Sequence, residues 1–340
     1  MGTATSKIRI DRPIKVRSEG LFGLSAGPEL IYLLLPRLLP VILLLVLPLV
    51  LSPYWTKVLT ITCIITLLAL SWDLLHLVGM ISLGQSMFFG VGAYVTGSLN
   101  HYFGLPPIVT IPLAALLGSV ICTLLLLPLM RLRGLYFAMV TMALASILVR
   151  IIEATGILGG TTGLSALDPL PNAWVEVYLA IASTIVCLFA LRRLDNSDYG
   201  VVLRGIGEND RAVLSGGINV FWFKTQTLYL GGVVGCFAGA YMTHVISSVG
   251  IAAFAFDNSV LPVASVVIGG AGNFAGAMLG AFILVPLSEF LRAFGGLRIV
   301  FYCLTLVVFV VLMPGGIFPF LKKRYFQYRK TAANGEQNGR

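Results

Sequence analysis

Long apolar runs recur along this chain and constrain its fold more than any other feature. The run from Pro107 to Met130 contains no Asp, Glu, Lys or Arg. An apolar segment of about 20 residues is long enough to span the hydrocarbon core of a bilayer as a helix. The runs do not alternate apolar with polar residues, as the strands of a membrane β-barrel do. The sequence therefore predicts an all-α, polytopic bundle of transmembrane helices.

The composition of the whole chain excludes an ordinary soluble domain. Of the 340 residues, 58% are hydrophobic and 11% are charged, whereas charged residues make up about a quarter of a typical soluble protein. The mean hydropathy is +0.95. An integral membrane protein is expected.

Charges, prolines and glycines divide the apolar part of the chain into about ten segments. The predicted segments are Ile31–Leu51, Lys57–Met80, Leu83–Asn100, Pro107–Met130, Leu135–Ile152, Ala173–Leu194, Thr225–Ser248, Ser259–Ala271, Ala277–Phe294 and Leu297–Met313. An even number of crossings places both ends of the chain on the same side of the membrane. We expect residues 30–320 to form the transmembrane domain, with tails at 1–29 and 321–340.

The lysines and arginines indicate which side of the membrane the tails occupy. Eighteen of the 23 Lys and Arg residues fall in the two tails, in the turn Arg131–Arg133 and in the segment Arg192–Lys224. Cytoplasmic loops accumulate such residues, so both termini are predicted to be cytoplasmic. This bias and the attraction of anionic lipids explain the net charge of +9, which therefore does not indicate nucleic-acid binding.

Two glycine-rich segments interrupt the pattern of plain helices. Ile81–Tyr94 reads ISLGQSMFFGVGAY, and Val266–Gly280 reads VVIGGAGNFAGAMLG. The second follows an apolar run of about 13 residues, which is too short to cross a bilayer at 1.5 Å per residue. We therefore expect broken or half-crossing helices at both places, and their similarity suggests an internal repeat of the transporter kind.

These two segments are also the predicted translocation path. Irregular backbone at membrane depth has to be buried in protein or to line a wet cavity. The candidate path residues are Asp73, Ser82, Gly84, Gln85, Gly269, Gly270 and Asn273.

Glycines at intervals of four residues predict close packing of helices. Small residues at this spacing let membrane helices approach one another closely. The two ladders are Gly231, Gly235 and Gly239, and Gly272, Gly276 and Gly280.

Asp73 and Glu289 are carboxylates inside predicted spans. Ionisable groups at such positions are costly to bury unless they are paired, and they are functional candidates for that reason. His76 follows Asp73 on the same helical face, which allows a proton relay through Asp73, His76 and Glu289. Simple structural pairing is the alternative, because Arg292 lies three residues after Glu289.

The segment from 195 to 224 places several charges in an otherwise apolar chain. Its sequence contains RGIGENDRAVLSGGIN, and the singled-out residues are Arg204, Glu208, Asn209, Asp210, Arg211, Ala212 and Gly217. Acidic residues followed by two glycines predict a short helix near Glu208–Ser215 within a loop of about 30 residues. Such a helix is suited to docking into a groove of another protein. A solvated surface turn is the equally open alternative.

No enzyme active site is recognisable in the sequence. The chain has no G-x-x-x-x-G-K-[ST] motif and no Gly-Lys pair, so it lacks the usual loop that holds ATP phosphates. Apart from Asp73 near His76, its three histidines have no acidic residue at metal-ligand spacing. We expect neither a cofactor nor a metal site in this chain.

Five stretches, in order along the chain, resemble one known family. They are Ser82–Tyr94, Arg133–Leu148, Leu158–Leu164, Gly200–Lys224 and Val267–Ala281. They are similar to the LivM family, the permeases of branched-chain amino acid ABC transporters, and the resemblance runs from about Leu67 to Phe320. At Gln85 the family often has His, and at Asp73 it commonly has Asn.

The resemblance implies a function, a location and a set of partners. It implies a membrane subunit of a bacterial inner-membrane importer, with a LivH-like second permease, two cytoplasmic ATPases that bind ATP and Mg²⁺, and a periplasmic substrate-binding protein. Glu208, Asn209, Asp210, Arg211 and Ala212 match the family's ENxRA stretch, which is similar to the ATPase-coupling loop of other importers. Permeases of similar type carry urea, amides or other amino acids, and a proton-coupled secondary transporter remains the alternative from another class.

Overall fold

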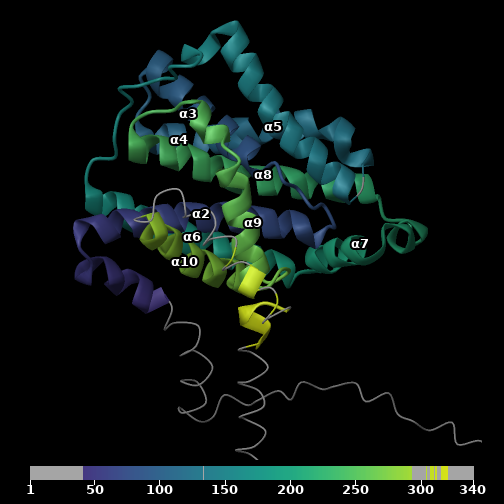
Figure 1. Cartoon of the computed structure of the whole chain (residues 1–340). Coiled ribbons are helices and arrows are strands. Elements are labelled where there is room, and N and C mark those ends of the chain that lie inside the picture. The colour runs from purple at the N-terminus through teal and green to yellow at the C-terminus, as the bar shows by residue number, and fades with distance from the viewer. Residues whose placement is uncertain are drawn as a thin grey trace, which may run out of the picture. The chain divides into compact units, whose positions relative to one another are not determined.

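The computed structural model describes residues 41–132, 134–292, 304, 307–309, 311 and 315–320. The long helices are α2 (Pro53–Leu77), α3 (Gln85–Phe103), α4 (Pro107–Leu126), α5 (Leu135–Thr155), α6 (Ala173–Asp195), α7 (Asp198–Ser215), α8 (Val220–Ile246), α9 (Asp257–Gly269) and α10 (Phe274–Phe290) (Figure 1). Short 3-10 helices are η1 (Leu127–Arg131), η2 (Ile157–Gly159) and η3 (Ile251–Phe254). All of these belong to one unit that begins at Leu47, and the preceding unit ends at Val46.

Prolines and glycines explain where several of these helices begin and end. Pro53 and Pro107 occupy the first turns of α2 and α4, where the missing N–H of proline costs nothing. Gly104 and Gly156 follow α3 and α5 in the left-handed conformation, which stops a helix and favours glycine. Asn219 caps α8, because its side-chain oxygen accepts the N–H of Trp222.

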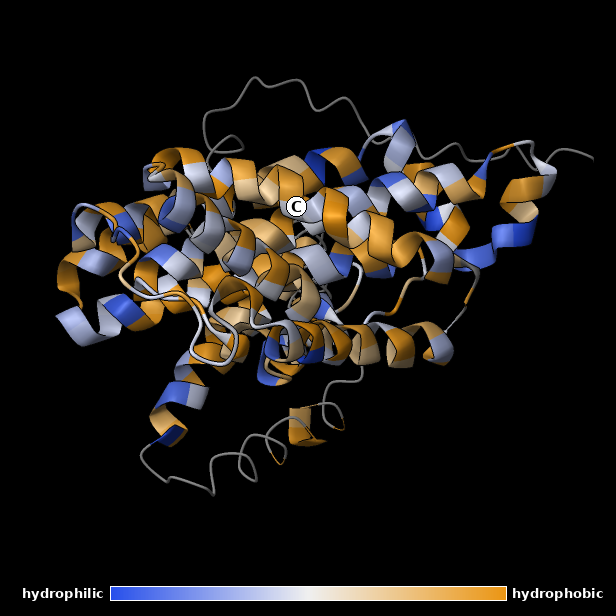
Figure 2. Ribbon diagram, turned by 90° about the horizontal axis from the view of Figure 1, so that it is seen from above, coloured by the Kyte–Doolittle hydropathy of each residue, from blue (hydrophilic) through white to orange (hydrophobic). Residues whose placement is uncertain are grey.

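The helices confirm the prediction of a multi-pass membrane protein. In the described part of the chain, six segments are long and apolar enough to cross a bilayer: Pro53–Leu77, Pro107–Met130, Leu135–Thr155, Ala173–Asp195, Val220–Ile246 and Ile251–Gly269. Val41–Val50 and Phe274–Phe290 are shorter apolar helices. Hydrophobic residues cover most of the long helices (Figure 2). Most of the predicted segment Leu297–Met313 lies outside the described residues.

Helix α2 forms the centre of the bundle, and α5 lies at its edge. In the most apolar part of α2, 94% of residues are buried, against 22% in α5. Helix α2 packs against α6, α8, α9 and α10, which is expected of a helix that is apolar all round. The exposed side chains of α5 include Leu135, Tyr136, Met139 and Ile147, which suit contact with lipid.

Two boundaries near the first break differ from the sequence-based prediction. Helix α2 ends at Leu77 rather than Met80, because Gly79 adopts a positive φ of 75° and turns the chain. Helix α3 begins at Gln85 and runs three residues past the predicted end to Phe103. The irregular link between α2 and α3 therefore comprises residues 78–84, which we call the first break.

The second break lies between α9 and α10 and comprises residues 270–273. Helix α9 has 13 residues, so it is short, as was predicted for the segment Ser259–Ala271. Together with η3, however, the apolar stretch Ile251–Gly269 has 19 residues and meets the length needed for a crossing. Helix α10 begins at Phe274, three residues before the predicted start, because the side chain of Asn273 caps it.

The region 195–224 is mostly helical. The short helix predicted near Glu208–Ser215 forms the second part of α7, but the prediction of a long loop before it was wrong. Helix α7 has 18 residues and bends at Asn209, where φ is −156° and ψ is 96°. The N-terminal half of the helix is amphipathic: Leu203 and Ile206 are buried while Val201 is exposed. Burial of that face stabilises a helix whose mixed composition gives only a weak signal in the sequence.

Candidate functional site

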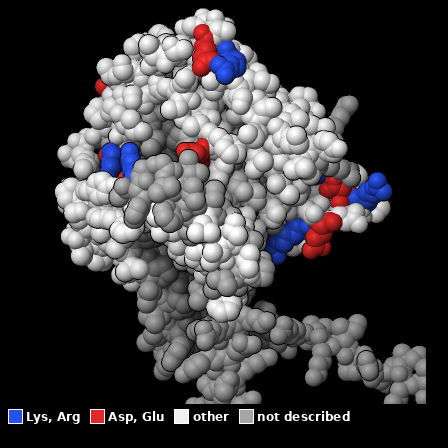
Figure 3. Space-filling view, viewed as in Figure 1, with Lys and Arg blue, Asp and Glu red and all other residues white. Residues whose placement is uncertain are grey.

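The bend in α7 separates two short helical pieces and exposes charged groups between them. The side-chain oxygen of Asn209 accepts the N–H of Arg211 at 3.1 Å and of Ala212 at 3.3 Å, so Asn209 caps the second piece. Glu208 and Arg211 are exposed, and neither forms an ion pair within the described residues. Figure 3 shows that charged side chains are sparse on this face and gather over α7.

Ion pairs attach each half of α7 to a neighbouring helix. Lys224 at the start of α8 lies 2.9 Å from Asp210, and their side chains are 13% and 18% exposed. Arg204 lies 2.7 Å from Asp195 at the end of α6. Gly217, with φ of 80°, forms part of the tight turn between α7 and α8. A force on the exposed bend would therefore reach both α6 and α8.

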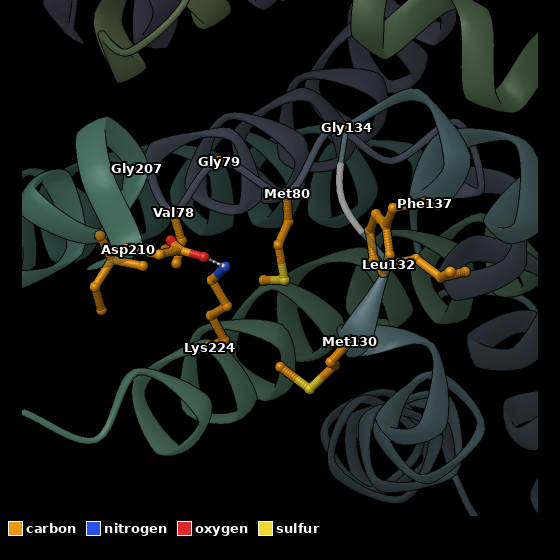
Figure 4. Close-up of a pocket in the computed structure, with 11 residues that line it drawn as sticks. Val78, Gly79, Met80, Met130, Leu132, Gly134, Phe137, Gly207, Asp210 and Lys224 are labelled. Carbon is orange, nitrogen blue, oxygen red and sulfur yellow. Dashed lines mark hydrogen bonds and ion pairs between the residues drawn. The ribbon is translucent and has the colours of Figure 1, made fainter. Parts of the chain in front are cut away.

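Helix α7 also lies directly against the end of α2. A Cβ atom on Gly207 would overlap the carbonyl oxygen of Leu77 and come within 3.5 Å of the amide nitrogen of Gly79. Only glycine permits so close a backbone approach. A small cavity of about 110 Å³ lies beside this contact, between the first break, η1, α5, α7 and the Asp210–Lys224 pair (Figure 4).

Three consecutive residues near this end of α2 hold other parts of the bundle, and we call them the α2 clamp. The Ser71 hydroxyl donates to the Gly231 carbonyl on α8 at 2.7 Å. The Trp72 indole N–H donates to the Ser82 carbonyl in the first break at 2.6 Å. The Asp73 carboxylate accepts the Gly272 N–H in the second break at 2.7 Å. All three clamp residues are buried.

The first break and the start of α3 are tightly packed rather than open. The Ser82 hydroxyl accepts the Gly84 N–H at 3.1 Å, and a Cβ on Gly84 would come within 2.8 Å of the Thr141 carbonyl carbon. Gln85 is buried, and its side-chain oxygen lies 3.4 Å from the Ser71 hydroxyl. Its side-chain nitrogen has no hydrogen-bond partner within the described residues.

The second break has similar close contacts. A Cβ on Gly269 would overlap the carbonyl of Gly276, and Gly270 has a φ of 111°. The Asn273 side chain accepts the Ala275 N–H at 3.3 Å as the cap of α10. Of the seven predicted path residues, Asp73 alone bridges from α2 to this break.

The glycine ladders lie where helices approach closely, with one exception. A Cβ on Gly231 would lie 3.2 Å from the Leu75 side chain, and one on Gly235 would lie 2.8 Å from Phe88. A Cβ on Gly239 would overlap the Phe89 carbonyl oxygen, and one on Gly280 would overlap the Ser265 carbonyl oxygen. A Cβ on Gly276 would lie 2.6 Å from the Gly269 carbonyl oxygen. Gly272 differs from the prediction, because it lies in the second break with φ of 76° and nothing within 4 Å of a Cβ. Gly272 contacts Asp73 through its backbone N–H rather than through close packing of helices.

The groups of the predicted proton relay do not come together. Asp73 and His76 share no hydrogen bond; the His76 ring stacks on Trp72 with centroids 5.1 Å apart. Glu289 instead accepts a hydrogen bond from the Tyr54 hydroxyl at 2.7 Å and pairs with Arg292 at 3.0 Å. Tyr54 and Asp73 lie 19 residues apart on α2, which corresponds to about 28 Å along the helix axis. Within the described residues, no three His, Cys, Asp or Glu side chains form a possible metal site.

A larger cavity lies at the opposite end of the helices from α7, and we call it the distal cavity. It has a volume of about 370 Å³ and lies among α2, α3, α8, η3, α9 and α10. Its lining includes Ile61, Ile64, Ile65, Leu261, Val285, Ser288 and Glu289. Sequence reasoning missed it, because its lining is made of common apolar residues from distant segments. Glu289 was the only residue of this lining that the sequence analysis singled out.

Comparisons with known proteins agree with the resemblance. Residues 54–313 match the family model described as branched-chain amino acid transport system / permease component. The chain is 26% identical over 322 residues to the high-affinity branched-chain amino acid transport system permease protein LivM of Escherichia coli strain K12, covering 85% of this chain and 76% of that protein. It is 27% identical over 237 residues to the probable branched-chain amino acid transport permease protein LivM of Methanocaldococcus jannaschii, covering 62% of this chain and 69% of that protein. No solved structure matches the chain.

The family match covers α2 to α10, the two breaks and the α7 region between α6 and α8. The long apolar helices agree with a membrane permease. The chain therefore belongs to the family of permease components of branched-chain amino acid transport systems.

Proposed function

We propose that this chain is one of two membrane-spanning subunits of an ATP-driven importer for branched-chain amino acids. The partners are a LivH-like permease, two ATPases that bind ATP and Mg²⁺, and a substrate-binding protein that delivers the amino acid. The complex lies in the bacterial inner membrane with both termini of this chain in the cytoplasm. The names of its relatives support the substrate, and the excess of Lys and Arg in the tails and around α7 supports the orientation.

The observation that carries this proposal is the exposed bend of α7 held against the end of α2. Glu208 and Arg211 are exposed at the bend, while a Cβ on the adjacent Gly207 would overlap the Leu77 carbonyl oxygen. An ATPase that grips the bend more tightly in one nucleotide state than in the other would shift α7 and with it α2. Such a difference in affinity is required, because equal affinity for both states moves nothing.

The test exchanges the charges at the bend without changing the net charge. A double variant with Glu208→Arg and Arg211→Glu is expected to weaken attachment of the ATPases and to abolish ATP-dependent leucine uptake in proteoliposomes. Arg150 and Glu153 provide the matched control, because they form an exposed pair with the same spacing at the far end of α5. Exchanging their charges should leave both measurements unchanged.

Uptake and ATPase attachment that survive the exchange at the bend would overturn the proposal. Uptake that stops when an uncoupler is added, while ATP is held constant, would point instead to a proton-coupled carrier. Wild-type uptake that requires ATP and the binding protein, and resists the uncoupler, is the expected result.

A further inference from the structure

The distal cavity has the size of a site for a small molecule. Its volume of about 370 Å³ falls within the range of roughly 300–1,000 Å³ that is common for ligand sites. It takes its walls from the N-terminal half of α2, the C-terminal third of α8 and the C-terminal end of α10. Helix α7 adjoins the other end of α8 at Val220, so the cavity and the α7 bend lie at opposite ends of the bundle.

One wall of the cavity is aliphatic. Ile61, Ile64 and Ile65 are spaced three and four residues apart and therefore lie on one face of α2. Leu261 on α9 and Val285 on α10 extend this surface. Ile64 and Ile65 are buried, with exposures of 1% and 5%. A branched aliphatic side chain fits such a wall, because apolar surface is removed from water on both partners.

Charged groups stand at the α10 side of the cavity. Glu289 lines it, and its carboxylate lies 3.0 Å from the guanidinium of Arg292, which is not itself part of the lining. The Tyr54 hydroxyl donates to the same oxygen of Glu289 at 2.7 Å and so helps to orient the carboxylate. The Arg292 side chain is 68% exposed, while that of Glu289 is 16% exposed. A pair of opposite charges is the electrostatic complement of a zwitterion.

Two other polar side chains of the lining, Thr243 and Asn258, bond to the walls themselves. Thr243 donates to the backbone carbonyl of Gly239 at 3.1 Å. Asn258 donates to the carbonyls of Ala252 and Ala253 at 3.4 and 3.0 Å. These bonds fix the shape of the cavity near η3. Glu289 is therefore the charged group of the lining that is placed to meet a ligand.

We infer that the distal cavity is a transit site for an α-amino acid with an aliphatic side chain, an inference that rests on the proposed function. The side chain lies on the isoleucine face of α2, the ammonium group meets Glu289, and the carboxylate meets Arg292. The cavity then receives the amino acid as the binding protein releases it, before α2 and the two breaks rearrange. Because the Glu289–Arg292 pair already satisfies its own charges, binding here is weak, as a transit site requires.

A photoreactive leucine analogue tests the site directly. The complete transporter in proteoliposomes is loaded with the substrate-binding protein carrying photo-leucine, which has a diazirine in its side chain, and is irradiated. Mass spectrometry is expected to find the label on peptides of α2 and α10 that contain Ile61 to Ile65 or Val285. If the label in the membrane subunits falls only on peptides that do not line the cavity, or only on lipid, the inference is overturned.

Two variants sharpen the test. Ala252 lines the cavity and is exposed, whereas Ala255 in the same segment is exposed but does not line it. Ala252→Phe should narrow the cavity and reduce labelling of the cavity peptides. In the Ala255→Phe variant these peptides should be labelled to the same extent as in the wild type. Glu289→Gln should reduce labelling roughly tenfold, because charge-assisted hydrogen bonds are about twice as strong as neutral ones.

Thermal unfolding of each variant complex shows whether it has folded, and equal labelling of Ala252→Phe and wild type in folded complexes overturns the inference. The failure of this inference differs from that of the proposed function. If uptake by the wild type requires ATP but no label reaches the cavity, only the transit site is wrong. If the wild type shows no ATP-dependent uptake, the proposed function is wrong.

Discussion

Asp73 shows how a single buried carboxylate can join two distant parts of the bundle. One of its oxygens accepts the Gly272 N–H at 2.7 Å, and the other has no hydrogen-bond partner within the described residues. Its neighbour Trp72 holds the first break in the same way, through the Ser82 carbonyl. A movement of this turn of α2 therefore pulls on both breaks together.

Replacement of Asp73 by leucine should uncouple ATP hydrolysis from transport. Leucine has the same number of side-chain heavy atoms but cannot accept the Gly272 N–H, so the hydrogen bond that joins α2 to the second break is lost. We expect ATP hydrolysis by the assembled transporter to continue, while leucine uptake per ATP falls severalfold. Both rates are measured in the same proteoliposomes.

The matched variant is Asp73→Asn, which removes the charge but keeps an oxygen that can accept the Gly272 N–H. It should retain most of the uptake. A loss of uptake in Asp73→Asn as complete as in Asp73→Leu would contradict the positional role and would revive a role for the charge of Asp73 in proton transfer.

At the scale of the element, α7 depends on two contacts that the bundle supplies. Its bend is fixed by the Asp210–Lys224 pair, and its backbone is seated on α2 through Gly207. The first contact sets the angle between α7 and α8, and the second sets the distance to α2. Each can be removed separately.

Gly207→Ala should displace α7 from the end of α2. A Cβ there would overlap the Leu77 carbonyl, and neither atom belongs to a flexible side chain. We expect lower uptake and a lower thermal unfolding temperature of the complex, although alanine is intrinsically favoured over glycine inside a helix by about 1 kcal/mol.

Gly205→Ala is the control within the same helix. A Cβ there meets only the Val213 side chain at 3.3 Å, and that methyl group can move. Uptake should be unchanged and stability equal or higher. If the two alanine variants behave alike, the contact between α7 and α2 does not transmit motion.

Removal of the Asp210–Lys224 pair should loosen the turn between α7 and α8. Lys224→Met leaves the Asp210 carboxylate, which is 18% exposed, without its lysine, and should lower the unfolding temperature. A double-mutant cycle with Asp210→Asn is expected to give a coupling energy of about 1 kcal/mol, as for a pair near the surface. A coupling energy of zero would show that the pair does not hold the turn.

The sequence could predict the second half of α7 but not the first. Acidic residues at the start and the glycine pair at the end are local signals, and the helix does stop at Ser215. The residues from Asp198 to Glu208 form a helix because Leu203 and Ile206 are buried against neighbouring helices. That stabilisation comes from tertiary contacts, which no local pattern contains.

The same limit applies to the candidate site. The carboxylate of Asp73 was recognisable as a costly buried charge, but its partner Gly272 lies 199 residues away. Helical spacing pointed to His76 instead, because only neighbours three or four residues apart can be read from periodicity. For the same reason only Glu289 pointed to the distal cavity, since its walls come from five α-helices and η3.

For the molecule as a whole, the two breaks give the bundle a common mechanical pattern. Each break joins two consecutive helices, α2 to α3 and α9 to α10, and each is held by the α2 clamp. Helix α2 contacts α7 at one end and lines the distal cavity with its other half. A displacement at the bend of α7 thus has a continuous packed route to the cavity through one helix.

The orientation of this route in the membrane can be measured with single cysteines. Asn172 comes directly before α6 and Ser215 ends α7, the helix that follows α6, and both residues are exposed. In a background without the five native cysteines, Ser215→Cys should react with a membrane-impermeant maleimide only in inside-out vesicles. Asn172→Cys should react only in intact spheroplasts. The excess of Lys and Arg around α7 is the physical reason for this expectation. The opposite labelling would place α7 outside the cell, where no ATPase could reach its bend.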